Sequence, residues 1–181
     1  MKACLSSKNR SDKSYLSGDC YEKKILGIDP GSTTIGYGVL SYKNSNAKPL
    51  TVGYGYIDLK KYHGQHKLLQ LHKDLKELIK QYKPDCMAVE NVYFFKNAKT
   101  ITTVMQSKGV ILLTAAMFNV TIHEYTPLQI KQTISGYGRA DKKFIQKLVQ
   151  SSLAIKSDIK PDDASDALAI ALCHLRHLTS L

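Results

Sequence analysis

Hydrophobic positions along the chain form short runs near the N-terminus and longer helical repeats further on. Three strand-like runs come first, at residues 24–29, 34–42 and 50–59. The second and third runs, which contain IGYGVL and VGYGYI, alternate glycine with aliphatic or aromatic residues. Glycines inside a strand weaken it and usually mark a bulge or the close approach of another backbone. We therefore expect three strands, with a bulge or a close contact at these glycines.

Helical periodicity begins after the third run. Apolar residues recur every three or four positions from 68 to 82, lysines occupy the other face, and the pattern stops before Pro84. A short apolar run at 86–89 then leads into Glu90. The rest of the chain predicts a helix at 98–118, a strand at 120–125 and helices at 128–134, 141–153 and 161–178. This order indicates an α/β protein in which helices flank a mixed five-stranded sheet.

Residues 1–22 lack this periodicity. They are polar, and the segment SSKNRSDKS is typical of disorder, so we expect a flexible N-terminal extension followed by one domain at 23–181. No stretch approaches the roughly 18 consecutive apolar residues of a membrane span. The N-terminus also lacks the apolar segment of a secretion signal. These features predict a cytoplasmic protein that does not associate with membranes.

Cysteine and histidine give no metal-site pattern in the sequence. The four cysteines are isolated, without the paired spacing of a zinc or redox site. Cys86 and Cys173 lie in apolar surroundings, which predicts that they fill the core. His174 and His177 are three residues apart, but no third ligand is near them in the sequence. We expect the histidines to lie at the surface or at helix ends.

The charge of the chain points to a polyanionic partner. The formal net charge is +11 and the isoelectric point is near 9.4. Such a balance favours binding to nucleic acid. The alternative is a basic surface that serves only solubility.

Four acidic residues lie in apolar surroundings. Asp29 ends the first run, Glu90 ends the run at 86–89, and Asp163 and Asp166 belong to PDDASDALAIAL. A carboxylate beside the core is unfavourable unless it is compensated, and carboxylates from separate segments are typical of a site for Mg²⁺ or Mn²⁺. Asp163 and Asp166 are three apart at a helix start, so they project from one face of the first turn. Asp162 is expected to cap that helix.

Aromatic and basic residues near these acids are candidates for substrate contacts. At least one ring of the sequence Tyr93-Phe94-Phe95 should be exposed, where it either fills a loop or stacks on a base. A basic stretch near the last acids comprises Lys131, Arg139, Lys142 and Lys143. These side chains are either a solvated face or contacts to phosphates.

Four sequence blocks resemble one known family. ILGIDPGSTTIGYGVL, MAVENVYFFKNA, IKQTISGYGRADK and PDDASDALAIAL resemble, in the same order, the motifs of the RuvC-type crossover junction endodeoxyribonucleases, which are Holliday junction resolvases. The resemblance runs from about residue 24 to the C-terminus. It implies a ribonuclease H-like fold and an endonuclease that resolves four-way DNA junctions in homologous recombination and DNA repair, leaving 5′-phosphate ends.

The resemblance also implies roles for individual residues. It assigns catalysis and metal binding to Asp29, Glu90, Asp163 and Asp166. They would hold two Mg²⁺ ions, or Mn²⁺, about 3.5–4 Å apart, one activating water and the other stabilising the leaving 3′ oxygen. We expect Asp29 to bridge both ions. Tyr93 stands where the family has phenylalanine, and Lys131 and Lys142 match family lysines needed for junction handling.

The resemblance further implies partners. Symmetric incision of two strands needs two active sites, so a homodimer is implied. The helix at 98–118, with Gly109, Ala115 and Ala116, is our candidate for the interface, although a purely intradomain role is equally open. A branch-migration complex of the RuvA–RuvB type is a further implied partner.

Other functions remain open at the level of sequence. Within the same fold, they are an RNA–DNA hybrid hydrolase and a Yqg-type resolvase-like protein. In other classes, they are an actin-like ATPase or sugar kinase, and a junction-binding protein without catalysis. The acids, all present, disfavour the last, and no second Asp-Gly phosphate-binding hairpin supports an actin-like ATPase or sugar kinase.

Overall fold

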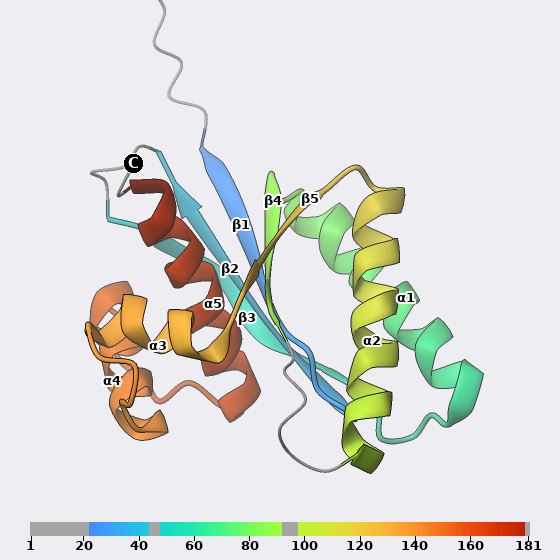
Figure 1. Ribbon diagram of the computed structural model, residues 1–181. Helices are drawn as coiled ribbons and strands as arrows, with labels where there is room; N and C mark the ends of the chain where they lie inside the picture. The colour runs from blue at the N-terminus through green and yellow to red at the C-terminus, as the bar shows by residue number, and fades with distance from the viewer. Residues whose placement is uncertain (1–21, 44–47, 92–97, 180–181) are drawn as a thin grey trace, which may run out of the picture.

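The structure is a computed structural model that describes residues 22–43, 48–91 and 98–179 (Figure 1). This part of the chain contains a five-stranded sheet and five helices. In chain order the elements are β1 (Lys23–Asp29), β2 (Thr34–Tyr42), β3 (Leu50–Asp58), α1 (Gly64–Tyr82), β4 (Cys86–Glu90), α2 (Ala98–Met117), β5 (Thr121–Tyr125), α3 (Pro127–Ser135), α4 (Lys142–Leu153) and α5 (Asp162–Thr179). The predicted order of elements is confirmed.

The sheet is mixed, as predicted. Its strand order is β3-β2-β1-β4-β5, with β1 antiparallel to β2 and parallel to β4. β2 and β3 are antiparallel, and β4 and β5 are parallel. Thus the N-terminal hairpins supply one half of the sheet, and the two strands that follow helices supply the other. β1 is the central strand that joins the two halves.

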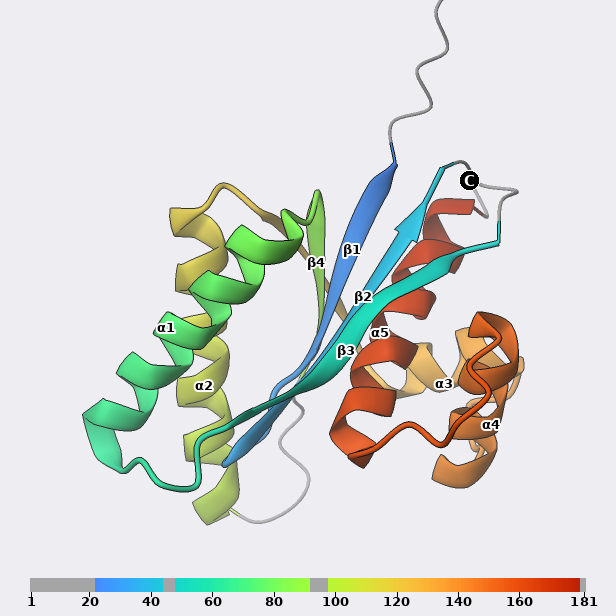
Figure 2. The same ribbon diagram turned by 180° about the vertical axis from the view of Figure 1, so that it is seen from behind.

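Helices cover both faces of the sheet. α1 and α2 lie on one face, and α5 lies on the other with α3 and α4 beside it (Figures 1 and 2). Side chains of a strand alternate between faces, and β1 follows this rule. Leu26 and Ile28 belong to the core under α1 and α2, whereas Ile25 belongs to the core under α5. By the same alternation, Gly27 and Asp29 face α5.

α5 lies very close to the middle of the sheet because glycines face it. A Cβ on Gly27 would overlap the backbone carbonyl of Ala167, and a Cβ on Gly36 would overlap that of Asp163. A Cβ on Gly38 would lie 2.7 Å from the side chain of Leu168. The expected close approach at strand glycines is therefore confirmed, and β2 also has a register shift between Val39 and Leu40.

The N-terminal prediction falls mostly on residues that the structure does not describe, since only Glu22 of residues 1–22 is included. Its carboxylate accepts a hydrogen bond from the Ser41 hydroxyl on β2. Of the helices in the described residues, none has both the length and the apolar character needed to cross a membrane.

Replacing Gly36 tests the packing of α5. In Gly36→Ala the new Cβ would overlap the Asp163 carbonyl, so α5 or β2 must shift. We expect a loss of roughly 1–3 kcal/mol in the free energy of unfolding, as for other overpacked sites. Urea denaturation measures this change.

Gly109→Ala on α2 is the matched control. Its added Cβ has no atom of the described residues within 4 Å, and alanine favours a helix over glycine by up to about 1 kcal/mol. We expect this variant to be at least as stable as the wild type. A Gly36→Ala protein of unchanged stability would contradict the close packing of α5 on β2.

Candidate active site

Two carboxylates meet at the ends of adjacent strands. Asp29 is the last residue of β1, and Glu90 is the last residue of β4. The two strands are parallel, and Ile28 is paired with Val89, so the following residues lie side by side at the same edge. The alternation that buries Met87 and Val89 on the α1–α2 side directs Glu90 towards α5. Two short apolar runs thus carry both acids to one place.

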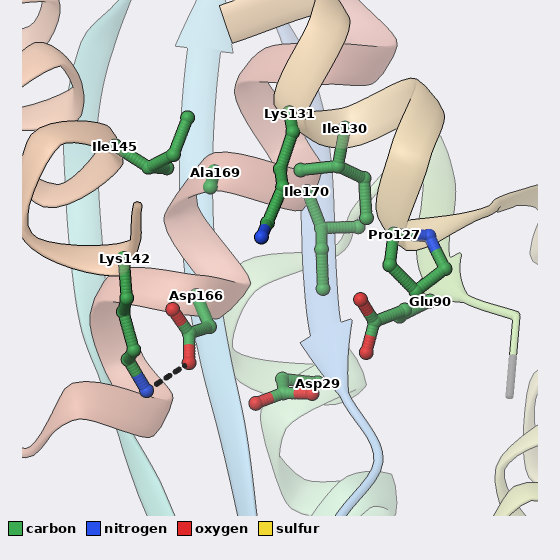
Figure 3. A pocket seen from close by; sticks show the side chains of 10 residues that line it. All are labelled: Asp29, Glu90, Pro127, Ile130, Lys131, Lys142, Ile145, Asp166, Ala169 and Ile170. Carbon is green, nitrogen blue, oxygen red and sulfur yellow. Dashed lines mark hydrogen bonds and ion pairs between the residues drawn. The ribbon is translucent and has the colours of Figure 1, made fainter. Parts of the chain in front are cut away.

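α5 adds a third carboxylate to this place. Asp166 lines the same cavity as Asp29 and Glu90, a space of about 250 Å³ (Figure 3). Asp163 is not among the residues that line this cavity, because its backbone is packed against Gly36. It is nevertheless near enough for its charge to raise the pKa values of Asp29 and Asp166. The structure therefore brings three of the four predicted acids into one cavity and holds Asp163 at its edge.

Burial and mutual repulsion make these acids hard to ionise. Burial, followed by the charges of Glu90, Asp166 and Asp163, raises the pKa of Asp29 to about 8. Burial and the charge of Asp166 raise the pKa of Glu90 to about 7. Burial also raises the pKa of Asp166. The cluster has more negative charge than its surroundings can compensate.

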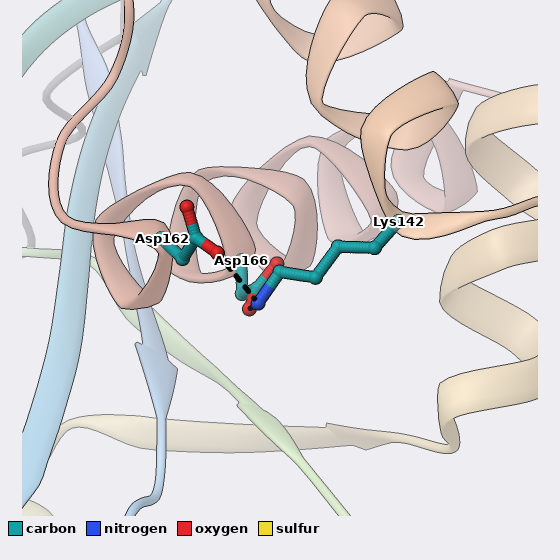
Figure 4. A network of polar contacts seen from close by, with 3 residues as sticks. All are labelled: Lys142, Asp162 and Asp166. Carbon is teal, nitrogen blue, oxygen red and sulfur yellow. Dashed lines mark hydrogen bonds and ion pairs between the residues drawn. The ribbon is translucent and has the colours of Figure 1, made fainter.

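Lys142 supplies the nearest positive charge. Its Nζ donates a hydrogen bond of 2.8 Å to Oδ2 of Asp166 and lies 3.5 Å from Oδ2 of Asp162 (Figure 4). These carboxylates raise the pKa of Lys142 despite its partial burial. Asp162 was expected to cap α5, but it is the first residue inside the helix and pairs with Lys142 instead.

Of the other predicted DNA contacts that the structure describes, Lys131 lines the cavity, whereas Arg139 and Lys143 do not. Lys131 lines it and points towards its centre (Figure 3), and its charge lowers the pKa of Glu90. Arg139 and Lys143 are exposed and are not lining residues. Lys143 instead lines an adjoining hollow of about 260 Å³ together with Lys147 and Lys160. Tyr93 lies outside the described residues.

The sequence pattern did not predict one buried lysine near the site. The Lys108 side chain on α2 is only 7% exposed, and its Nζ lies 2.9 Å from both Glu124 and Asn91. The Asn91 amide donates a 2.7 Å hydrogen bond to the carbonyl of Tyr125. These contacts hold the residue that follows Glu90. The sequence did not indicate that Lys108 is buried, because a single lysine in a helix is usually predicted to be exposed.

The carboxylates fit a divalent metal ion. Among the described residues, the carboxylates of Asp29 and Glu90 accept no hydrogen bond, and burial together with the charges of neighbouring acids raises the pKa of both. Oxygen donors of this kind suit hard cations. The residues present are thus consistent with a metal-dependent reaction at this edge of the sheet.

The mixed sheet and the carboxylates at the ends of β1 and β4 place the protein in the ribonuclease H-like class of metal-dependent nucleases. The sequence profile described as Crossover junction endodeoxyribonuclease RuvC matches residues 25–174. The chain belongs to this family.

Relatives and solved structures agree with this membership. A crossover junction endodeoxyribonuclease RuvC from Caldicellulosiruptor saccharolyticus is 46% identical over 162 residues, which is 87% of this chain and 95% of the relative. One from Syntrophomonas wolfei is 45% identical over 152 residues, covering 84% and 88%. Thermus thermophilus RuvC in complex with a Holliday junction substrate superposes with a TM-score of 0.81 at 28% identity, covering 87% of this chain and 96% of that one.

A more distant structure shares the fold. The yeast mitochondrial Holliday junction resolvase Ydc2 gives a TM-score of 0.64 at 15% identity, over 85% of this chain and 78% of that one. The family match decides against an actin-like ATPase or sugar kinase, because it covers residues 25–174 with a single endonuclease family. The protein is a crossover junction endodeoxyribonuclease and not an actin-like ATPase or sugar kinase.

The raised pKa of Asp29 predicts how stability depends on pH when EDTA removes metal ions. In the folded protein the raised pKa lets Asp29 keep its proton up to about pH 8, whereas an aspartate ordinarily loses it near pH 3.8. Proton binding therefore stabilises the fold at low pH, and this contribution is lost as the pH rises through 8. We expect the free energy of unfolding to fall by roughly 1 kcal/mol per pH unit between the two values.

Asp29→Asn should remove much of this fall, since asparagine has no proton to lose. Urea denaturation at a series of pH values measures it, and Glu77→Gln on the exposed face of α1 is the control. Parallel pH curves for the wild type and Asp29→Asn would contradict the assignment of Asp29 as a buried, proton-holding carboxylate.

Proposed function

We propose that the protein is a structure-selective endonuclease that resolves four-way DNA junctions by paired, metal-dependent incisions in homologous recombination and repair. The observation that carries this proposal is the cavity in which Asp29, Glu90 and Asp166 meet between Lys131 and Lys142. Acids at the base and lysines at the sides suit a phosphodiester held against metal ions. The chain also belongs to the RuvC family, and the related Thermus thermophilus protein has been solved with a Holliday junction.

In this proposal Asp29, Glu90, Asp163 and Asp166 are the catalytic residues that hold two Mg²⁺ ions, with Asp29 shared between them. Mn²⁺ would suit the same oxygen donors. When bound, the ions supply a water of lowered pKa and stabilise negative charge on the phosphate. The raised pKa values of Asp29 and Glu90 support this assignment, because a cation removes the repulsion that causes part of each shift.

Lys142 and Lys131 orient the phosphate in this proposal. Lys142 Nζ bonds to Asp166, so its charge lies at the acids, where a phosphate oxygen would lie. Lys131 points into the cavity from the side of Glu90 (Figure 3). Two ammonium groups on different helices can contact different oxygens of one phosphate and so fix its orientation.

Further along the surface, basic residues offer a path for the DNA backbone. Arg139 and Lys143 are exposed near Lys142, and Lys147 follows Lys143 by one helical turn on α4. Lys143, Lys147 and Lys160 line the adjoining hollow. Tyr93 is proposed to stack on a base at the opened crossover, on the strength of its place in the sequence motif.

We propose a homodimer that forms along α2. The helix has an exposed stripe at the spacing of one helical face, comprising Met105, Gly109, Leu112, Leu113, Ala116 and Met117. Leu113 and Met117 are each 61% exposed. An apolar patch of this kind usually marks a contact with another molecule. Ala115, one of the residues expected at the interface, is instead fully buried within the chain.

The remaining partners follow from the proposed reaction. An enzyme that cuts junctions would work with a branch-migration complex of the RuvA–RuvB type, and it would act in the cytoplasm, where bacterial chromosomal DNA lies. The family membership supports both inferences.

The proposal is tested with a synthetic four-way junction. We expect symmetric nicks with 5′-phosphate ends in Mg²⁺ and no cleavage in EDTA. Linear duplex and RNA–DNA hybrid of the same sequence should be cut far more slowly. Preferential hydrolysis of the hybrid would overturn the proposal in favour of a different ribonuclease H-like activity.

Asp29→Asn and Asp166→Asn should separate binding from cleavage. Each removes a metal ligand while the basic surface stays intact, so cleavage should fall at least 100-fold with junction affinity changed little. Gel-shift titration in Ca²⁺ beside cleavage in Mg²⁺ measures the two properties. Loss of binding in parallel with cleavage, at unchanged thermal stability, would count against this division of labour.

Leu113→Glu should break the proposed dimer. A charge in the centre of an apolar interface is costly to bury, so the variant should sediment as a monomer and lose paired incision. Leu69→Glu is the matched control, because Leu69 is 50% exposed on the neighbouring α1 and lies off the stripe. If both variants sediment like the wild type, α2 is not the interface.

A further inference from the structure

A second cluster of metal-binding side chains lies at the other end of α5. Cys86 on β4, His123 on β5 and His174 on α5 each offer one ligand atom, and these atoms all lie within 4.8 Å of one another. His174 is eight residues after Asp166, which corresponds to about 12 Å along the helix axis. The expectation that the histidines lie at the surface or at helix ends is wrong for His174, which is only 2% exposed.

Strand register brings the first two residues together. β4 and β5 are parallel, with Ala88 paired to His123 and Cys86 paired to Thr121. Cys86 and His123 are therefore on the same face of neighbouring strands, two positions apart. Helix α5 crosses this face and adds His174 from above. No short sequence motif links the three residues, since 37 and 51 positions separate them along the chain.

The contacts of His174 hold one ring nitrogen and direct the other at Cys86. Its Nδ1 lies 2.7 Å from the hydroxyl of Tyr125, and its Nε2 lies 3.3 Å from the sulfur of Cys86. A histidine that binds a metal usually has its other nitrogen held by a hydrogen-bond partner, which orients the ring. Tyr125 fills this role here. The ring of His123 stacks on that of His174 at 4.2 Å between centroids.

We propose that Cys86, His123 and His174 bind one zinc-type ion, separate from the carboxylate site. One sulfur and two imidazole nitrogens select Zn²⁺ over Mg²⁺, which prefers oxygen. Tetrahedral Zn²⁺ with these ligands needs donor atoms roughly 3.3–3.7 Å apart. The Cys86–His174 separation of 3.3 Å lies at the short end of this range, and the His123 donor atom, within 4.8 Å of the other two, would move closer on binding.

The proposed ion would join three elements of the fold. It ties the C-terminal half of α5 to β4 and β5, and the other end of β4 carries Glu90. Cys86 and His123 are partly exposed, so an ion and a water as fourth ligand can enter from solvent. The role is structural and does not depend on the proposed junction cleavage.

Cobalt binding to the full-length protein tests this site. Co²⁺ takes the same ligands as Zn²⁺ and gives a charge-transfer absorption only when a thiolate binds it. We expect one such ion per chain, displaced by Zn²⁺. Cys86→Ser should abolish the band and weaken Zn²⁺ binding at least tenfold in competition with a chromogenic chelator. His123→Gln should weaken it similarly and, because His123 is partly exposed, should leave the protein folded.

Three controls distinguish metal binding at this site from metal binding by other side chains. Cys173→Ala removes a buried thiol outside the cluster and should keep the band. Glu90→Gln alters the carboxylate site and should keep it too. All proteins are also compared with Cys4 and Cys20 changed to serine, because these thiols lie outside the described residues.

Thermal unfolding gives an independent measure of Zn²⁺ binding. Zn²⁺ should raise the melting temperature of the wild type but not that of Cys86→Ser, because binding to the folded state alone stabilises it. Mg²⁺ should not distinguish the two proteins. A Cys86→Ser protein that binds Zn²⁺ as tightly as the wild type, with the cobalt band unchanged, would overturn the proposal. So would a band that disappears when only Cys4 and Cys20 are replaced.

Discussion

The close contact between α5 and the first two strands is the constraint on which the site depends. Gly27, Gly36 and Gly38 present no side chain to α5, so at Gly27 and Gly36 the strand backbone lies directly against the helix backbone. This contact places Asp166 over the end of β1, where Asp29 lies. A helix held one side-chain layer further away would leave Asp166 too distant to share a cation with Asp29. The glycines thus serve the chemistry although none of them takes part in it.

Electrostatics at the site follow from that packing. Three acids in a small, partly buried cavity repel one another, and among the described residues Lys142 and Lys131 offset them. Such an arrangement weakens the fold unless cations are present, which is common where function and stability compete. The bond between Lys142 and Asp166 is the protein's own partial compensation. It also keeps the lysine beside the acids, ready for a negatively charged substrate.

Local patterns in the sequence were sufficient to predict the elements and two of the acids. The runs that end at Asp29 and Glu90 are apolar and short, and strand alternation then determines which face each carboxylate takes. Helix spacing could not separate Asp163 from Asp166, because their different positions depend on where α5 meets Gly36. That contact joins residues more than a hundred positions apart.

Long-range register explains what sequence reasoning missed. Lys108 is buried only because Asn91 and Glu124 come together at the ends of β4 and β5. Strand pairing likewise brings Cys86 beside His123, and the packing of α5 on the sheet adds His174. In both cases the residue types were ordinary and their partners were distant. Local sequence patterns predict only whether such residues are exposed or buried, and they do not identify distant partners.

The alternation of side chains along β1 has a consequence for how this enzyme can evolve. Leu26 and Ile28 face the layer formed by α1 and α2, whereas Gly27 and Asp29 face α5. The central strand therefore insulates one layer from the other. Apart from Lys108, whose contacts hold the residue after Glu90, residues on the α1–α2 side can change while the carboxylates keep their positions. A lineage can in this way exchange the outer surface of the enzyme and inherit its chemistry unaltered.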